Sequence, residues 1–428
     1  MKKLFLFYCL AALGLLNKAN AQNVDGQSTP IDSSIMYVNG EGTFLRLGKT
    51  QDTKLNLITT IQTGFQFNQL DSTNGLTNTN RMSLNMVRMS FTASTLKDKV
   101  TMGIVTDFTS VTPILEGWVG FSVWKKHGKI ILGQRQTNTN NRLAMADERY
   151  AQVMGQTFAG KSNDGIVYGG FMQNFVGSTR EVGLFFETNF KFKNWKIYPS
   201  VSITTGEGQN FFASQPNLGF KYGGRIDVLP FGDFIKNNAF IAHDIYREHK
   251  PKLAVGFAAS YNVKASSAIG TDNAQITGIY NKSGVADYAN YTKVVADFIF
   301  KQNGFALVGE YVNGSISGTD LFTNVSNTNK LTPVLASAYY NLGSAFNIQS
   351  SYVFNNGWAV DGRYASVMPE FDVVNSNIRT QQWYTFGVNK FMKNNAAKIG
   401  LNINYIENVT PLITTKKIAA NLAVQILL

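Results

Sequence analysis

Apolar and polar residues alternate with a period of two along most of the chain. In residues 54–67, KLNLITTIQTGFQF, the odd positions are mainly apolar and the even positions are mainly polar. A period of two is typical of a β-strand whose two faces meet different surroundings. The same clear alternation recurs in 100–108, 180–192, 196–204, 252–263, 292–301, 398–406 and 417–427. The pattern therefore predicts an all-β protein.

Shorter or weaker alternation adds further strand candidates. These are 81–94, 114–123, 127–135, 165–172, 218–228, 304–313, 332–341, 346–354, 357–366 and 379–391. Together the segments predict 16 strands, or alternatively 18, of roughly 9 to 13 residues, which is the length that a tilted strand needs to cross a bilayer. The choice between 16 and 18 depends on residues 331–366, where the alternation is weakest.

The connections between these segments differ in length. Short ones occur at 96–98 and 355–357, and the long ones are 136–164, 229–251, 264–290 and 314–331. Transmembrane barrels have short turns at one rim and long loops at the other. We therefore expect the long connections to share one rim.

Composition indicates which face of the strands meets which medium. Charged residues make up only 15% of the chain and aromatic residues 13%, whereas charged residues are about 25% of ordinary soluble domains. A soluble β-sandwich needs about 100 to 200 residues, but here the alternation continues without a domain break. We interpret the apolar face as lipid-facing and the polar face as the lining of an aqueous lumen. The prediction is an antiparallel up-and-down transmembrane β-barrel; sandwiches are the alternative, and no short repeat supports a β-helix.

The N-terminus resembles an export signal. Two lysines precede an apolar run at 4–16, and Ala19-Asn20-Ala21 fits a small-residue cleavage site. We predict a signal peptide at 1–21, a flexible leader at 22–42 and the barrel at 43–428; a retained N-terminal anchor is the alternative. The single cysteine, Cys9, lies in the predicted signal, so the mature chain has no disulfide or thiolate metal site.

The chain carries an excess of basic residues. It has 39 Lys and Arg against 27 Asp and Glu, a formal charge of +12, and removing the three lysines of the predicted signal leaves +9. A basic excess favours anionic partners such as small anions or lipopolysaccharide. No run of five basic residues occurs, so a nucleic-acid partner is not expected.

Basic residues provide the candidate site. Arg135, Arg142 and Arg149 are evenly spaced at the start of the long connection 136–164, and could form a basic constriction that attracts anions. The alternative is a solvated loop, or salt bridges between loop and barrel that involve Asp147 and Glu148. On the predicted strands, basic residues occupy the polar faces at Lys129, Lys221, Arg225 and Lys293. Acidic residues share these faces at Asp107, Asp227, Asp297 and Glu310, and can neutralise them.

Catalytic and cofactor motifs are not apparent. The three histidines, His127, His243 and His249, lack metal-ligand spacing, and no nucleophile elbow, phosphate-binding loop or dinucleotide fingerprint occurs. We predict no cofactor and no enzyme activity. Some of the five tryptophans are expected in interfacial aromatic belts.

A succession of motifs resembles the phosphate-selective porin O and P family of Gram-negative outer membranes. The motifs are TFLRLGKTQDTKLNLITTIQTGFQF (43–67), NRMSLNMVRMSFTASTLKDKVTMGIVTDF (80–108), LEGWVGFSVWKKHGKIILGQRQ (115–136), GIVYGG (165–170), GFALVGEYVNG (304–314) and GWAVDGRYASV (357–367). Their order and spacing carry the resemblance, which covers most of the mature chain.

The resemblance implies a 16-stranded porin that forms a homotrimer in the cell outer membrane. It also implies an anion constriction formed by an inward-folded third loop. The matching loop is 136–164, whose basic residues are Arg142, Arg149 and Lys161, with Arg135 at its root. The chain departs from the family in having QTNTNNRL where an apolar Pro-Phe pair is usual, and in ending with Leu428 instead of an aromatic residue.

These observations predict a porin for passive diffusion of small solutes with a preference for anions. The rival hypotheses are a general or sugar-tolerant porin, an outer-membrane barrel enzyme with a Ser–His pair, and a secreted soluble β binding module.

Overall fold

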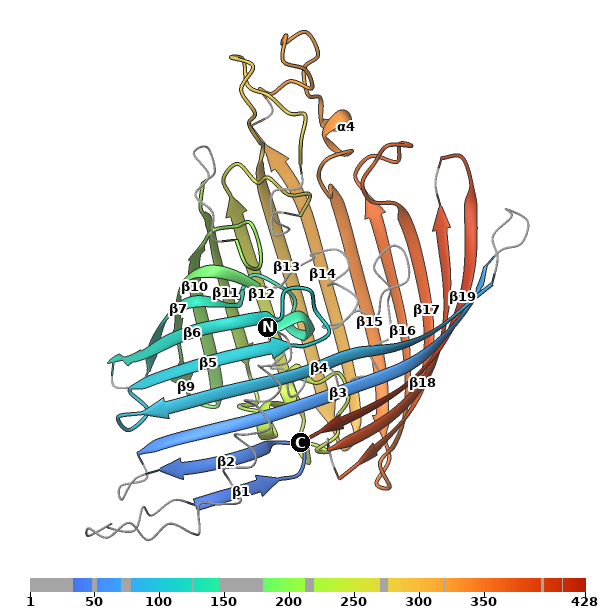
Figure 1. The fold of residues 1–428 in the computed structure, drawn as a ribbon. Coiled ribbons are helices and arrows are strands. Elements are labelled where there is room, and N and C mark those ends of the chain that lie inside the picture. The colour runs from blue at the N-terminus through green and yellow to red at the C-terminus, as the bar shows by residue number, and fades with distance from the viewer. Residues whose placement is uncertain are drawn as a thin grey trace.

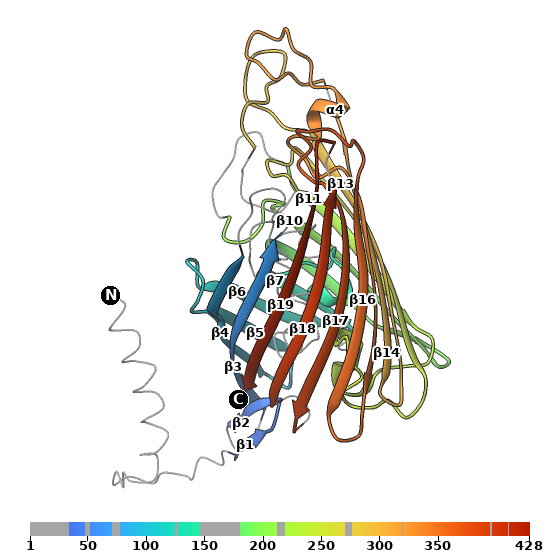
Figure 2. The same ribbon diagram turned by 90° about the vertical axis from the view of Figure 1, so that its right-hand side faces the viewer.

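A closed antiparallel β-barrel makes up most of the computed structural model (Figures 1 and 2). The structure describes residues 34–47, 52–70, 78–124, 127–145, 180–211, 219–269, 276–318, 320–393, 396–409 and 411–428. The predicted signal peptide at 1–21, the strand candidate at 165–172, Arg149 and Lys161 lie outside the described residues.

Sixteen strands form the barrel wall, because β8 and β9 are separated only by Asn189, both pair with β10, and together form one wall strand. The wall strands are β3 (Thr53–Leu70), β4 (Thr79–Thr95), β5 (Val100–Asp107), β6 (Ile114–Val123), β7 (Gly128–Gln136), β8 (Arg180–Thr188) with β9 (Phe190–Phe192), β10 (Trp195–Thr204), β11 (Lys221–Leu229), β12 (Lys252–Asn262), β13 (Asn290–Gln302), β14 (Phe305–Ser317), β15 (Gly343–Val353), β16 (Trp358–Pro369), β17 (Thr380–Met392), β18 (Ala397–Val409) and β19 (Thr414–Leu427).

Each wall strand pairs antiparallel with the strands next to it in sequence. The barrel closes where β19 pairs with β3, from Lys417 opposite Leu70 to Leu427 opposite Thr60. Closure satisfies the backbone hydrogen bonds that an open sheet edge would leave without partners in lipid. The predicted up-and-down barrel of 16 strands is confirmed.

The two faces of the strands separate as predicted. On β3, Ile61 is 43% exposed on the outer surface, whereas the neighbouring Gln62 is buried in the interior. β13 alternates in the same way, with Lys293 and Asp297 buried inside the barrel. Outward apolar side chains thus cover the surface that faces lipid, and polar side chains line the lumen.

A short hairpin precedes the barrel. β1 (Ser34–Val38) pairs with β2 (Gly42–Leu47), which pairs with the first part of β3. β1 lies within the segment predicted as the flexible leader, and its side chains are mostly exposed.

The predicted strand at 332–341 is wrong. The structure has the short helix α4 (Pro333–Ala336) there, and Thr332 caps it by accepting a hydrogen bond from the Leu335 amide at 3.3 Å. A Thr N-cap followed by proline at the first helical position is a helix-start signal. With this segment removed, only β15 and β16 cross the barrel in the ambiguous region, which gives 16 strands.

Helices are short in the described part of the chain. They are η3 (Arg142–Met145), η4 (Ile235–Phe240) and α4, and none is long and apolar enough to cross a membrane.

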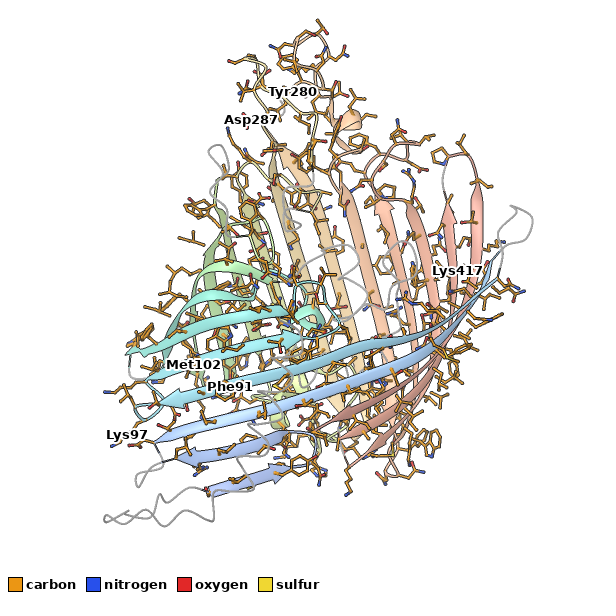
Figure 3. All side chains as sticks on the ribbon, in the orientation of Figure 1. Phe91, Lys97, Met102, Tyr280, Asp287 and Lys417 are labelled. Atoms are coloured by element: carbon orange, nitrogen blue, oxygen red, sulfur yellow. The ribbon has the colours of Figure 1, made fainter. Side chains whose placement is uncertain are left out.

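The two rims differ in the length of their connections. Lys97 marks a short turn at one rim, whereas Tyr280 and Asp287 lie in loops that project from the other (Figure 3). These projecting loops share a small apolar core that includes Ile279, Leu331 and Tyr340.

One long connection lies at the unexpected rim. Residues 230–251 join β11 to β12 beside the short turn at 303–304, where the Asn303 amide donates to the Glu248 carbonyl at 2.8 Å. The expectation that all long connections share one rim is therefore wrong for this segment. The physical reason is that it folds into the barrel and packs against apolar lumen residues, so it is a buried element and not a surface loop.

Candidate functional site: an ion-paired constriction in the lumen

The chain turns into the lumen after β7, the fifth wall strand. Residues 137–145 form an entry loop, and its residues Asn140, Arg142 and Leu143 are almost completely buried. The Asn141 amide side chain donates to the Tyr311 carbonyl at 3.2 Å, and the Leu143 amide donates to the Glu310 carboxylate at 3.4 Å. The predicted inward folding of the loop after the fifth strand is confirmed for these residues.

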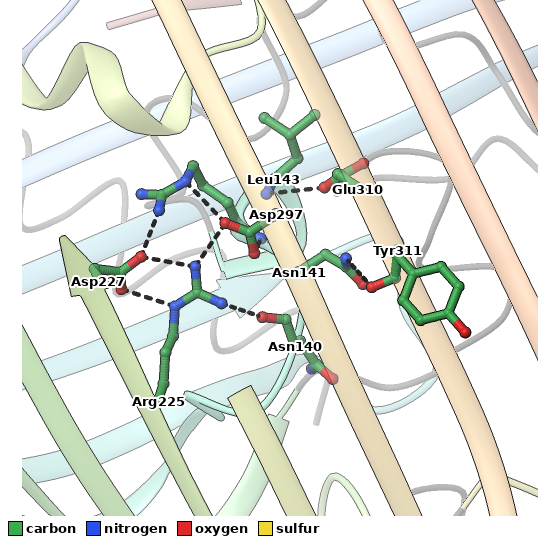
Figure 4. Close-up of polar contacts among 9 residues, drawn as sticks. Asn140, Asn141, Leu143, Arg225, Asp227, Asp297, Glu310 and Tyr311 are labelled. Atoms are coloured by element: carbon green, nitrogen blue, oxygen red, sulfur yellow. Dashed lines mark hydrogen bonds and ion pairs between the residues drawn. The ribbon is translucent and has the colours of Figure 1, made fainter. Parts of the chain in front are cut away.

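Two arginines and two aspartates fasten the entry loop to the wall (Figure 4). Arg142 donates from its amide and Nε to Asp297 at 3.0 and 3.1 Å, and its Nη2 contacts Asp227. Arg225 donates to Asp227 at 2.7 and 2.8 Å and to Asp297 at 2.8 Å. We call these four residues the latch.

The latch is neutral and almost completely buried. The side chains of Arg142 and Arg225 are each 2% exposed, Asp227 is 14% exposed and Asp297 is not exposed. A buried charge is tolerated only when an opposite charge and hydrogen bonds compensate for its lost hydration. The latch therefore positions the loop, and its arginines have little exposed surface with which to attract a passing anion.

A second segment enters the lumen from the opposite rim. Residues 230–251, which we call the inserted turn, contain η4 and bury Ile241 and Ala242 against lumen residues of β12 to β17. Leu143 of the entry loop belongs to the same apolar core, and the Arg142 guanidinium lies 5.6 Å from the Phe240 ring centroid. The two segments thus meet inside the barrel and narrow the lumen on the side of β10 to β17.

Polar contacts hold the inserted turn in place. Buried Lys301 of β13 donates to the Asn238 and His243 carbonyls, both at 2.7 Å, and to the Asn238 side chain at 2.6 Å. The His243 ring lies 3.3 Å from Asp361. Burial lowers the pKa of His243 because the interior disfavours the imidazolium ion, although Asp361 opposes this effect.

Lys129 and Arg135 occupy a more accessible part of the wall. Lys129 Nζ lies 4.8 Å from the Trp118 ring centroid, and the Arg135 guanidinium lies over Trp118 and Phe185 at 5.9 and 5.4 Å. Arg135 donates to Glu187 at 2.7 Å, in a pair whose side chains are 23% and 39% exposed. A pair with this exposure is hydrated and can exchange partners.

The remaining predicted basic residues are deeply buried. Lys221 pairs with Glu181 at 2.6 Å, and Lys293 donates to the Asn140 side chain at 2.6 Å. Six of the eight predicted pore residues thus lie on the inner wall or the entry loop, and the other two, Arg149 and Lys161, are outside the described residues.

Uncharged amides form a patch on the opposite side of the lumen, on β3, β18 and β19. Gln62 donates to Gln425 at 3.0 Å, and Asn404 and Asn421 both donate to Asn402 at 3.0 Å. The strands to which the two inserted segments attach form a charged wall. Across the lumen, the Asn and Gln residues form a neutral patch on β3, β18 and β19, next to buried Lys398 of β18.

A pocket of about 410 Å³ lies where the entry loop, the inserted turn and the charged wall meet. Its lining includes Arg135 and Glu187 from the wall, Met145 from the loop, and Phe234 and Phe240 from the inserted turn. No group of three or more His, Cys, Asp or Glu residues suited to a metal ion occurs in the described ranges.

Comparisons with known proteins identify a fold. No protein-family model and no curated protein sequence matches the chain. The fold is similar to three solved structures, each spanning 88–89% of this chain: the outer membrane channel DcaP of Acinetobacter baumannii (10% identity, 99% of that chain, TM-score 0.54), an anion-selective porin from Comamonas acidovorans (10%, 100%, 0.52) and OmpT, an outer membrane protein of Vibrio cholerae (11%, 98%, 0.50).

At 10–11% sequence identity, the structural similarity to these proteins establishes the fold of the chain alone. A closed barrel with an even number of strands and an apolar outer face is the architecture of outer-membrane proteins. The chain is therefore an outer-membrane β-barrel with the fold that these three proteins share.

Proposed function

We propose that the chain is a porin through which small solutes cross the outer membrane by passive diffusion. The observation that carries this proposal is the closed 16-stranded wall with its polar inner face, one side of which is narrowed by the entry loop and the inserted turn. A barrel of this size is wide enough to hold an aqueous channel.

We also propose that the channel has a modest preference for anions over cations. Lys129 and Arg135 supply it, because they are the more exposed cations among the predicted pore residues that the structure describes. Arg142, Arg225 and Lys221 are each paired with buried carboxylates, so they add little net field. A general porin with no ion preference is the second candidate, and this same pairing of charges favours it.

Swelling of proteoliposomes tests passive diffusion. With neutral sugars of increasing size, the swelling rate is expected to fall steadily with solute mass and to rise linearly with solute concentration. Swelling no faster than in protein-free vesicles, from protein that is shown to be folded and inserted, would contradict a diffusion channel.

Neutralising both accessible cations should reduce the anion preference. The Lys129→Gln/Arg135→Gln variant is expected to lower the chloride-to-potassium permeability ratio by about twofold or more, since each removed charge contributes to the local potential. Lys54→Gln, which alters an exposed pair with Asp98 at the rim, is the matched control. The reversal potential in a planar bilayer under a salt gradient measures this permeability ratio. Equal ratios for the wild type, the double variant and Lys54→Gln would contradict the assignment of the anion preference to Lys129 and Arg135.

Two finer features rest on the sequence resemblance. These are membership of the phosphate-selective O and P family and a homotrimer. The basic excess supports contact with lipopolysaccharide, and the N-terminal pattern supports export through a signal peptide cleaved after Ala21. Chemical cross-linking in native outer membranes tests the homotrimer directly, and N-terminal sequencing of the mature protein tests the cleavage.

A further inference from the structure

The pocket between the two inserted segments has an uneven distribution of accessible charge. Its arginines Arg142 and Arg225 belong to the latch and are almost fully buried. The Asp233 side chain is 50% exposed, but its partner Lys196, at 3.3 Å, is not part of the lining, and Asp233 also accepts a hydrogen bond from the Tyr198 hydroxyl. The Arg135–Glu187 pair is the part of the lining in which both a cation and an anion keep exposed surface.

Arg135 has spare hydrogen-bonding capacity. A guanidinium carries five N–H donors, and among the described residues only Glu187 receives a hydrogen bond from Arg135, through Nη1. The guanidinium carbon lies over the Trp118 and Phe185 rings, 5.9 and 5.4 Å from their centroids, and the rings restrict its position. Its edge can therefore present a fork to a planar carboxylate.

Part of the remaining pocket lining is apolar, beside polar residues such as Asn138 and Ser200. The apolar lining residues are Met145, Leu229, Phe234, Ala239 and Phe240. Small-molecule sites combine such a surface with a few placed polar groups, and volumes of about 300 to 1,000 Å³ are typical. The volume of about 410 Å³ therefore suits a solute with a charged end and an apolar end.

We propose that this pocket binds free α-amino acids, with the carboxylate on Arg135, the ammonium on Glu187 and the side chain on the apolar surface. The proposal rests on the proposed function, because it assigns a solute class to the same channel. An α-amino acid carries opposite charges on one carbon atom, so it complements two opposite charges that lie 2.7 Å apart. When the Arg135–Glu187 pair opens, each member gains a new partner and neither charge is left alone.

A solute with a single charge lacks this balance. A carboxylate without an amine would take Arg135 from Glu187 and leave Glu187 with only its cross-strand neighbour Lys129 nearby. An amine without a carboxylate would take Glu187 and leave Arg135 without its partner. Leaving a charged group without a partner opposes binding. The pocket should therefore discriminate against close analogues that lack either group.

Blocking of single-channel current tests the proposal with four matched probes at pH 7. The probes are L-phenylalanine, 3-phenylpropanoate, 2-phenylethylamine and the neutral 3-phenylpropanamide, each added to wild-type protein conducting in potassium chloride. We expect a saturable reduction of current by phenylalanine, with a half-blocking concentration about fivefold to tenfold lower than for the other three. Equal block by all four probes, or none, would overturn the proposal.

Variants separate the two charged contacts. In Arg135→Gln, phenylalanine is expected to lose its advantage over 2-phenylethylamine, and in Glu187→Gln its advantage over 3-phenylpropanoate. Lys54→Gln should retain the wild-type order of the probes. A channel that conducts salt but does not discriminate among the probes would refute the pocket and leave the porin intact, whereas the absence of any conductance would refute the porin itself.

Discussion

Asp297→Asn is expected to release the entry loop and to make the channel more anion-selective. Asp297 accepts two hydrogen bonds from Arg142 and one from Arg225. The variant removes one of the two negative charges in the latch and leaves two buried cations. Breaking a buried pair in this way costs about 3–5 kcal/mol, so the docked position of the loop should lose much of its stability. Single-channel recordings should show a larger, noisier conductance and a higher chloride-to-potassium permeability ratio.

A charge-balanced variant separates the two effects. In Arg142→Gln/Asp297→Asn the latch keeps one cation and one anion, so selectivity should return toward the wild-type value while the loop remains loosely held. Asp98→Asn is the control, because its pair with Lys54 is exposed and contributes at most about 1 kcal/mol. Wild-type conductance and selectivity in Asp297→Asn would show that the latch does not position the loop.

Ile403→Arg is expected to destabilise the barrel strongly. Ile403 lies at the middle of β18 and is 50% exposed on the outer face. An arginine at the bilayer midplane on that face costs about 2–4 kcal/mol. Urea unfolding of the protein in lipid vesicles, followed by tryptophan fluorescence, measures the change in the free energy of unfolding.

The neighbouring residue Asn402 provides the comparison at the same depth. It faces the lumen, where Asn404 and Asn421 donate to it. Asn402→Arg should cost less than Ile403→Arg, because the new charge remains among polar groups and only two neutral hydrogen bonds, each worth about 1 kcal/mol, are lost. The reverse order would contradict the assignment of the two faces.

The period-two pattern was sufficient to predict the barrel because lipid and lumen impose opposite demands on alternate residues. Ile61 and Gln62 show this on β3, where one faces outward and the next is buried inside. The extra strand at 332–341 was predicted because a short helix and a strand can share a mixed apolar pattern. Thr332 and Pro333 carried the signal that distinguishes them.

The sequence did not predict the partners of Arg142. The sequence put Arg142 in the inward loop and left salt bridges open as an alternative, but its actual partners, Asp227 and Asp297, are distant in sequence. Which carboxylate meets which guanidinium depends on the strand register and on the path of the loop, and neither follows from local periodicity. The inserted turn was missed for the same reason, although the apolar run Ala239–Ala242 could have indicated burial.

The reversal potential of the purified wild-type protein in a planar bilayer under a salt gradient tests the central claim most directly. The account predicts steady conductance through an aqueous lumen, with a small potential of the sign for anion flow. The absence of channels from folded, inserted protein would contradict passive diffusion, and a potential of the cation sign would contradict the role given to Lys129 and Arg135.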